Sequence, residues 1–240
     1  LLPILLSNTD APKFDNPKRL ALKELYIISP LGFVGAFFIG LAHSVIFGYG
    51  VVYAIAKGLS IFEISIFMVI VSTFGAIFQW PVGLISDRID RRIILVSVTL
   101  MASILSILIV VSSYLSLVVF FIVLAFYAGM SLPMHSLAVA HTNDYLQPDE
   151  IVAASSSINI LVGIGAILGP ITVSLFMKVI GPDGFFVYLL IVHLLLGLFG
   201  LYRMGKRTKP ADIESQYVPL PRNISAAGME LNPKVENTED

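Results

Sequence analysis

Polar side chains interrupt several apolar runs of this sequence, and they are the residues that could do chemistry. Polar groups are costly inside a membrane-spanning run, so each is a candidate for contact with a solute. The candidates are His43, Tyr49, Gln79, Tyr127, His135 and Asn159. Two of them, His43 and His135, are histidines, which titrate near neutral pH and could therefore carry protons. A hydrogen bond between neighbouring helices is the alternative role for every candidate, and His193 is expected only to pack.

The sequence shows no arrangement typical of an enzyme. It contains no cysteine, which excludes disulfides and thiolate metal sites. It also has no phosphate-binding glycine loop, and no nucleophile stands beside an assignable base. We therefore expect no catalysis, no cofactor and no metal. A net charge of -1 gives no indication of a nucleic-acid partner.

A dense cluster of charge lies between two of the apolar runs. In the segment Asp87-Arg88-Ile89-Asp90-Arg91-Arg92 every residue but the isoleucine is charged. Ionised side chains at this density are tolerated only outside the hydrocarbon of a membrane. The segment is therefore predicted to be a very short hairpin between two membrane helices.

A membrane-embedded helical scaffold is needed to position these residues. The chain is 57% hydrophobic and 13% charged, whereas soluble domains average about 25% charged residues. Apolar runs of roughly 20 residues can each cross a bilayer as a helix. The predicted spans are Leu25–Ala54, Ile61–Ser86, Ile93–Val111, Leu117–Ala140, Ile151–Val179 and Phe185–Tyr202. The third of these is a plain apolar run and is expected to face lipid.

The start of the second span has the pattern of a capping box. Ser60 is followed three residues later by Glu63, so each side chain can bond the backbone N–H of the other. Glu63 is therefore predicted to cap a helix rather than to carry protons.

Glycine and proline interrupt the second and fifth spans, which correspond to each other if the six spans form two inverted sets of three. The interrupting residues are Pro81 in the second span and Gly165, Gly169 and Pro170 in the fifth. Interruptions at matching positions mark the substrate pathway in transporters built from repeats. Small residues four apart also allow helices to pack closely. A hinge and a packing contact are both compatible with this pattern.

The flanking segments differ from the spans in composition. Residues 1–6 are expected to end a preceding helix, 7–24 to form a cytoplasmic linker, 25–203 the six-helix bundle and 204–240 a disordered tail. The chain is therefore expected to be a fragment. Of 15 Lys and Arg residues, only Lys57 and Lys178 fall on one side of the predicted topology. The positive-inside rule places the other side, with both chain ends, in the cytoplasm.

The charged hairpin resembles the signature of the major facilitator superfamily, G-x-x-x-D-R-x-G-R followed by Arg or Lys. The matching residues are Gly83, Asp87, Arg88, Arg91 and Arg92, while Asp90 stands where the family usually has glycine. Six spans with the hairpin in this place resemble the carboxy-terminal half, helices seven to twelve. The resemblance implies an all-α membrane fold of two inverted three-helix repeats, in which helices seven, eight, ten and eleven line a cavity.

Local segments are also similar to the uncharacterised YcaD-like branch of this superfamily, namely Ala140–Tyr145, Val152–Ser156, Gly163–Pro170 and Tyr217–Arg222. The resemblance implies a secondary transporter of the bacterial inner membrane that moves a small solute by rocker-switch alternating access. Its partners would be protons, membrane lipid and the missing amino-terminal half, and the hairpin residues would latch the cytoplasmic face. A membrane sensor or scaffold that kept the fold but lost transport is the alternative.

Overall fold

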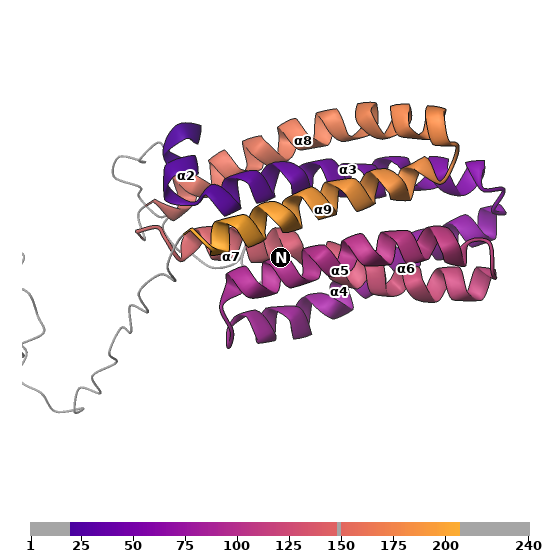
Figure 1. Ribbon diagram of the computed structural model, residues 1–240, viewed down its shortest axis with the longest axis horizontal. Helices are drawn as coiled ribbons and strands as arrows, with labels where there is room; N and C mark the ends of the chain where they lie inside the picture. The colour runs from indigo at the N-terminus through magenta and orange to yellow at the C-terminus, as the bar shows by residue number, and fades with distance from the viewer. Residues whose placement is uncertain (1–19, 148–149, 207–240) are drawn as a thin grey trace, which may run out of the picture. The chain divides into compact units, whose positions relative to one another are not determined.

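The computed structural model describes residues 20–147 and 150–206, and every regular element in these ranges is an α-helix (Figure 1). The helices are α2 (Leu22–Ile28), α3 (Pro30–Ala56), α4 (Ile61–Ser86), α5 (Arg91–Ser112), α6 (Leu117–Ser131), α7 (Met134–Asn143), α8 (Ile151–Ile180) and α9 (Gly184–Met204). Helices α6 and α7 form one span, so the described ranges hold six spans long and apolar enough to cross a membrane. The all-α membrane fold is confirmed. The preceding helix end, most of the linker and nearly all of the tail lie outside the described residues.

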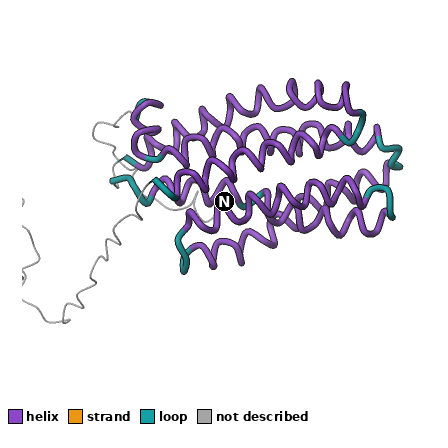
Figure 2. Tube along the Cα trace, in the orientation of Figure 1, coloured by secondary structure: helices purple, strands orange, loops and turns teal. Residues whose placement is uncertain are grey.

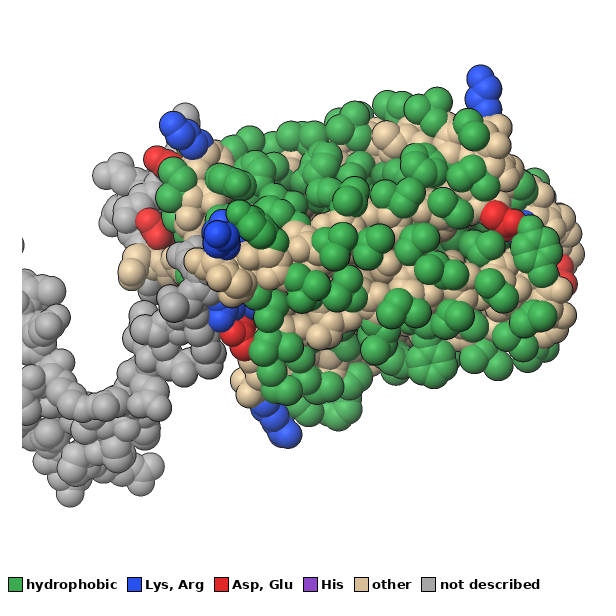
Figure 3. All heavy atoms as spheres, in the orientation of Figure 1, with side chains coloured by type: hydrophobic (Ala, Val, Ile, Leu, Met, Phe, Trp, Pro, Cys, Tyr) green, Lys and Arg blue, Asp and Glu red, His purple; other side chains and the backbone are tan. Residues whose placement is uncertain are grey.

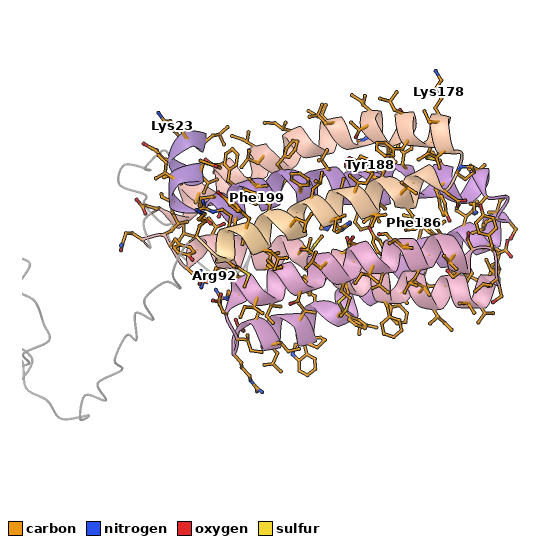
Figure 4. All side chains as sticks on the ribbon, in the orientation of Figure 1. Lys23, Arg92, Lys178, Phe186, Tyr188 and Phe199 are labelled. Carbon is orange, nitrogen blue, oxygen red and sulfur yellow. The ribbon has the colours of Figure 1, made fainter. Side chains whose placement is uncertain are left out.

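Loops of the helical unit gather at two opposite ends of the bundle (Figure 2). The hairpin end carries residues 87–90 and the α7–α8 connection, and the distal end carries residues 57–60, 113–116 and 181–183. Hydrophobic side chains cover the surface between the ends, where charged ones are scarce (Figure 3). Lys23 and Arg92 lie at the hairpin end and Lys178 at the distal end (Figure 4). This distribution suits a bundle that crosses a bilayer.

The first predicted span is wrong at its start, because Leu25–Ala54 is not one helix. The chain breaks at Ser29, whose ψ of 80° is not helical, and α3 begins at Pro30. Proline favours the first position of a helix because it lacks an N–H, and it disfavours a helical conformation in the residue before it. The Ser29 hydroxyl accepts a hydrogen bond from the Gly32 N–H at 3.3 Å and so caps α3.

The fourth predicted span is also interrupted, at Leu132 and Pro133 between α6 and α7. Proline in a helix interior removes one hydrogen bond and collides with the carbonyl four residues earlier, which here belongs to Gly129. By contrast, α4 and α8 continue through Pro81 and Pro170. Proline alone therefore did not identify which span would break.

The main packing partners agree with two repeats of three spans. Helix α3 packs against α8, α4 against α6, and α5 against α9. These pairs join the first span to the fifth, the second to the fourth and the third to the sixth. Exchanging the two sets of three spans converts the first pair into the second and leaves the third unchanged, as expected of a repeated unit.

Helix α5 differs from the lipid-facing helix that was predicted. One of its faces is exposed and apolar, but the other buries Thr99, Ser103 and Ser106. The most exposed helices are instead α4 and α8. In the apolar stretch of each span, 17% of α4 and 22% of α8 is buried, compared with 44% of α5. Hydroxyls that bond backbone carbonyls, as Thr99 does to Leu95 at 2.6 Å, can face a helix interface without cost.

The predicted capping box at the start of α4 is confirmed. The Glu63 carboxylate accepts from the Ser60 backbone N–H at 2.7 Å and from its hydroxyl at 2.8 Å. The Ser60 hydroxyl in turn accepts from the Glu63 N–H at 3.4 Å. Glu63 thus satisfies helix-end donors, as the spacing indicated.

Candidate functional site

The hairpin between α4 and α5 is tightened by its unusual residue, Asp90. Asp90 caps α5 by accepting from the Arg92 N–H at 2.9 Å. Its two carboxylate oxygens also accept from the Arg92 guanidinium, with distances of 2.7 to 3.1 Å. The φ of Asp90 is -50°, which any residue can adopt. The turn therefore does not need the glycine that the family motif has here.

Arg91 connects the hairpin to the other repeat. Its guanidinium donates to Asp87 at 3.0 Å and to Asp144, beyond the end of α7, at 2.6 Å. A third bond runs to the Ala140 carbonyl at 3.3 Å. The Asp87 side chain is 65% exposed, against 34% for Asp144. Because exposed ion pairs contribute little, the contact with Asp144 is the one that can hold the two segments together.

The surroundings of Asp144 oppose its negative charge. Burial raises the pKa of its carboxyl above the ordinary value, and the nearby Asp90 and Asp87 raise it further, while Arg91 lowers it. Desolvation is the largest of these effects, so the net direction is upward. Asp144 is therefore easier to protonate than a solvated aspartate.

Two motif residues leave a free surface at the hairpin. Arg88 is exposed, and its guanidinium makes no hydrogen bond or ion pair with any residue in the described ranges. A side chain at Gly83 would meet open space. Gly83 borders a cavity of about 140 Å³ that is also lined by Gln79, Asp87 and Ser136. A group from outside the described residues could therefore approach Gly83 and Asp87 closely.

A polar cluster inside the bundle joins α3, α6 and α9. His43 Nε2 lies 3.1 Å from the Ser131 carbonyl oxygen. The Ser131 hydroxyl lies 3.1 Å from His193 Nε2, and His193 Nδ1 lies 2.6 Å from the Leu189 carbonyl. Ser131 ends α6 at the helix break, where carbonyls lack partners within the helix. His193 thus packs against neighbouring helices, as expected, but with hydrogen bonds.

The acceptors fix where the protons lie in this cluster. A carbonyl can only accept, so His43 must donate from Nε2 and His193 from Nδ1. When His193 is neutral its Nε2 is therefore an acceptor, and the Ser131 hydroxyl donates to it. The remaining ring nitrogen of His43, Nδ1, has no hydrogen-bond partner among the described residues. His43 is half-buried, so this nitrogen is the group of the cluster that remains free to bind.

The other predicted pathway residues do not converge on one point. Gln79 is exposed and donates to the Ser136 hydroxyl at 2.7 Å, which links α4 to α7. Asn159 is exposed on α8, and His135 is half-buried on α7. Tyr49 packs half-buried against the apolar core. Tyr127 is buried, with its ring edge-to-face against His193 at 5.7 Å between centroids.

The glycines predicted for a hinge or a packing contact lie where α8 crosses α3. A side chain at Gly165 would collide with the Phe37 carbonyl, and one at Gly169 with the Ser44 hydroxyl. A side chain at Gly40 of α3 would likewise collide with the Val162 carbonyl. The two helix backbones therefore approach closely because both helices have glycine at the crossing.

Sequence reasoning missed Ser131 and Asp144, which organise the interior cluster and the hairpin contact. Serine is common in membrane helices, so its residue type alone did not single out Ser131. Its place one residue before Leu132-Pro133 was the available signal, because a helix break frees carbonyls. Asp144 was not predicted as a partner of the hairpin, since no pattern in the sequence links it to Arg91.

Comparison with known proteins agrees with this architecture. The sequence model of the Major Facilitator Superfamily matches residues 10–229. The curated relatives include "Uncharacterized MFS-type transporter YcaD" of Escherichia coli O139:H28 (strain E24377A / ETEC), 25% identical over 213 residues. The protein of the same name from Shigella sonnei (strain Ss046) has the same identity over the same length. In both cases the alignment covers 88% of this chain and 54% of the relative.

The chain thus spans about half the length of the curated relatives that it matches. A third relative, the YcaD protein of Escherichia coli O45:K1 (strain S88 / ExPEC), is 23% identical over 212 residues. No solved structure gives a significant match.

Proposed function

Because this chain belongs to the Major Facilitator Superfamily, we propose that it forms the carboxy-terminal six-helix half of a secondary transporter. In this proposal the spans of the chain are helices seven to twelve. The complete protein moves a small solute by rocker-switch alternating access, with the amino-terminal half as the second bundle. Both halves of such a protein supply the lining of its cavity, so the residues of this chain form one part of the substrate site.

The observation that carries this proposal is a stripe of small and polar residues on each of the two exposed helices. On α4 the stripe is Ser65, Ser72, Ala76, Gln79 and Gly83, and on α8 it is Ser156, Asn159, Gly163, Ala166 and Pro170; all are exposed or half-exposed. The spacing places each set on one helix face. An amide that faces lipid is costly, so these stripes belong against protein or water.

A neighbouring face of each helix is apolar and suits lipid. Ile77 on α4 is 56% exposed and Ile164 on α8 is 41% exposed. The contrast between faces of the same helix indicates that one side meets lipid and the other a cavity or a second bundle. In the proposed pathway Gln79 and Asn159 line that cavity, with His43, His135 and Tyr49 deeper in it. Tyr127 supports the pathway from inside the bundle.

We further propose that the hairpin is a conformational latch. Asp87 would contact a helix amino terminus of the other bundle, where a carboxylate is stabilised by roughly 0.3–2 kcal/mol. Arg88 would complete this contact, and the open space at Gly83 would admit the approaching backbone. Arg91 and Arg92 would hold the hairpin in shape through Asp144 and Asp90. Proton coupling would use His43 through its free Nδ1.

The proposed orientation places the hairpin end in the cytoplasm of a bacterial inner membrane. In the described ranges the basic residues of that end are Lys23, Arg88, Arg91, Arg92, Arg203 and Lys206, against Lys57 and Lys178 at the distal end. An excess of Lys and Arg beside the spans is the usual mark of the cytoplasmic side.

Cysteine accessibility tests the proposal directly, because the chain has no cysteine of its own. In the complete protein, Gln79→Cys and Asn159→Cys are expected to react with a water-soluble, membrane-impermeant maleimide. Ile77→Cys and Ile164→Cys are matched lipid-facing controls on the same helices and are expected to remain unlabelled. A transporter should also show a change in labelling when substrate is added.

Two outcomes would count against the proposal. Equal labelling of the polar positions and the isoleucine controls would contradict the proposed cavity. A sensor or scaffold would be favoured by two results together: strong labelling that no solute changes, and replacement of Gln79 and Asn159 without an effect on the function of the protein.

A further inference from the structure

A second polar pocket lies at the distal end, away from the hairpin and the interior histidines. It has a volume of about 300 Å³ and is lined by the end of α3, the turn into α4 and the α5–α6 turn. Its lining includes Tyr53, Lys57, Glu63, Ser113, Leu117 and Phe120. This volume is at the lower end of the range for small-molecule sites.

The buried hydroxyl of Tyr53 is the feature that points to a ligand. Tyr53 is 0% exposed, and its ring stacks on Phe185 at 4.9 Å and meets Phe186 edge-on at 5.0 Å between centroids. Its hydroxyl makes no hydrogen bond within the described ranges. An unpaired buried hydroxyl typically costs about 1–3 kcal/mol. A ligand in the adjoining pocket would remove this cost.

The charged residues of the pocket make hydrogen bonds within the protein but can still form others with a ligand. Lys57 donates to Asp183 at 2.9 Å and lies 4.4 Å from the centre of the Tyr114 ring. Tyr114 donates to the other oxygen of Asp183. An ammonium group has three N–H donors, and the bond to Asp183 uses one of them.

Glu63 offers the opposite charge on the same pocket. One of its carboxylate oxygens, Oε2, accepts both bonds from Ser60. The other oxygen, Oε1, has no hydrogen-bond donor in the described part of the chain. The pocket therefore presents an available cation, an available anion and a neutral hydroxyl, next to the apolar Leu117 and Phe120.

We propose that this pocket binds a zwitterionic head group that carries a primary ammonium and a phosphate, of the phosphoethanolamine type. Glu63 accepts from the ammonium, Lys57 donates to the phosphate, and the Tyr53 hydroxyl donates to the ester oxygen that joins the phosphate to the ethanolamine carbons. Leu117 and Phe120 contact the carbon atoms that follow the phosphate. The pocket lies where the apolar surface of the bundle ends, which is the level of lipid head groups. The inference does not depend on transport.

The experiment measures lipid retention and thermal stability of the purified protein in detergent. Phosphatidylethanolamine is compared with phosphatidylcholine, whose ammonium has no N–H, and with phosphatidylglycerol, which has no ammonium. We expect native mass spectrometry to find phosphatidylethanolamine retained about fivefold more than either, the factor that one hydrogen bond gives. Tyr53→Phe should lower the retention of phosphatidylethanolamine about fivefold, because it removes only the hydroxyl and with it one hydrogen bond. Glu63→Gln should abolish the preference for phosphatidylethanolamine, and glutamine preserves the capping box.

Tyr127→Phe is the matched control, because the Tyr127 hydroxyl is also buried without a hydrogen bond in the described ranges but does not line this pocket. In lipid-free detergent both phenylalanine variants should be at least as stable as the wild type. Only Tyr53→Phe should retain less phosphatidylethanolamine than the wild type. A separate titration with free O-phosphoethanolamine identifies the source: protection by the free compound indicates a soluble ligand, and protection by the lipid alone a membrane one.

Either source supports the proposed chemistry. A wild type that retains the three lipids equally and is not protected by O-phosphoethanolamine would overturn it. So would a Tyr53→Phe variant that retains as much phosphatidylethanolamine as the wild type.

Discussion

Arg91 Nη1 lies 2.6 Å from Asp144 Oδ1, and this ion pair joins the hairpin of the first three-span repeat to the end of α7 in the second. At the distal end Lys57 and Asp183 make an equivalent connection at 2.9 Å. Each end of the bundle is therefore tied by an ion pair between the repeats. These pairs favour motion of the six spans as one unit over motion between the repeats.

We expect Arg91→Ala to lower the free energy of unfolding by about 1 kcal/mol, the upper part of the range for partly exposed ion pairs. The loss should arise at Asp144, whose carboxylate would be left half-buried without its cation. Arg88→Ala is the control, since Arg88 has no ion-pair partner in the described ranges. Thermal unfolding of the purified variants measures the difference. Equal losses for the two variants would mean that the Asp144 contact is not closed in the protein.

The raised pKa of Asp144 predicts the sign of a pH effect. A carboxyl whose pKa is higher in the folded state binds protons more tightly when folded than when unfolded. The contribution of this carboxyl to stability therefore falls as the pH rises from ~3.9, the ordinary pKa of aspartate, through the raised pKa. Asp144→Asn should remove this dependence and leave the protein equally or more stable at neutral pH.

Thermal unfolding of the wild type and Asp144→Asn over this pH interval measures the effect. The groups that face Asp144 are Arg91, Asp87 and Asp90, and they are present in both proteins, so the difference curve isolates Asp144. A difference curve that shows the wild type gaining stability with pH would contradict the prediction.

Asp87 should matter for transport far more than for stability. Its side chain is 65% exposed and pairs with Arg91 only through an exposed contact of the kind that contributes little. We therefore expect Asp87→Asn to change the free energy of unfolding by less than about 0.5 kcal/mol. If the proposed latch operates, substrate uptake by proteoliposomes that contain the complete protein should nevertheless be strongly reduced or lost in Asp87→Asn, because the latch needs a charge. Normal substrate uptake by the Asp87→Asn variant would contradict the proposed latch.

The fold was largely predictable because its determinants are local. The apolar runs, the Ser60–Glu63 cap and the charged hairpin each indicate structure within a few residues of themselves. The breaks at Ser29-Pro30 and Leu132-Pro133 were missed. Their prolines look the same in the sequence as Pro81 and Pro170, which do not interrupt their helices. Tertiary packing decides which proline ends a helix, and a single sequence does not contain that packing.

The interior contacts were less predictable because they join distant residues. His43 was predicted to contact solute or to carry protons and His193 to pack, but their connection through Ser131 was not predicted. Asp90 departs from the family glycine, yet its φ of -50° and its bonds to Arg92 show a different way to form the same turn. The effect of aspartate in place of the family glycine becomes clear only when its partner, Arg92, is identified in the structure.

The Ser131 cluster should behave as one coupled unit. Ser131→Ala would leave His193 Nε2 buried without a donor, which we expect to cost about 1–3 kcal/mol. In His193→Phe the Ser131 hydroxyl loses its acceptor but can bond a carbonyl of its own helix, so the loss should be smaller. The double variant Ser131→Ala/His193→Phe should be less destabilised than the sum of the two. Thermal unfolding of all four proteins gives the interaction energy, and additive effects would show that the hydrogen bond at 3.1 Å contributes nothing.

Gly165 and Gly163 offer a sharp test of the α3–α8 crossing, because they are two residues apart on one helix. A methyl group at Gly165 would collide with backbone atoms of Phe37 and Leu41, whereas one at Gly163 would meet nothing. Since backbone cannot move aside as a side chain can, Gly165→Ala should cost about 1–3 kcal/mol. Gly163→Ala should be neutral or stabilising by up to about 1 kcal/mol, because alanine favours a helix. Thermal unfolding and the yield of folded protein in membranes measure both. Equal behaviour of the two variants would mean that α8 does not cross α3 at Gly165.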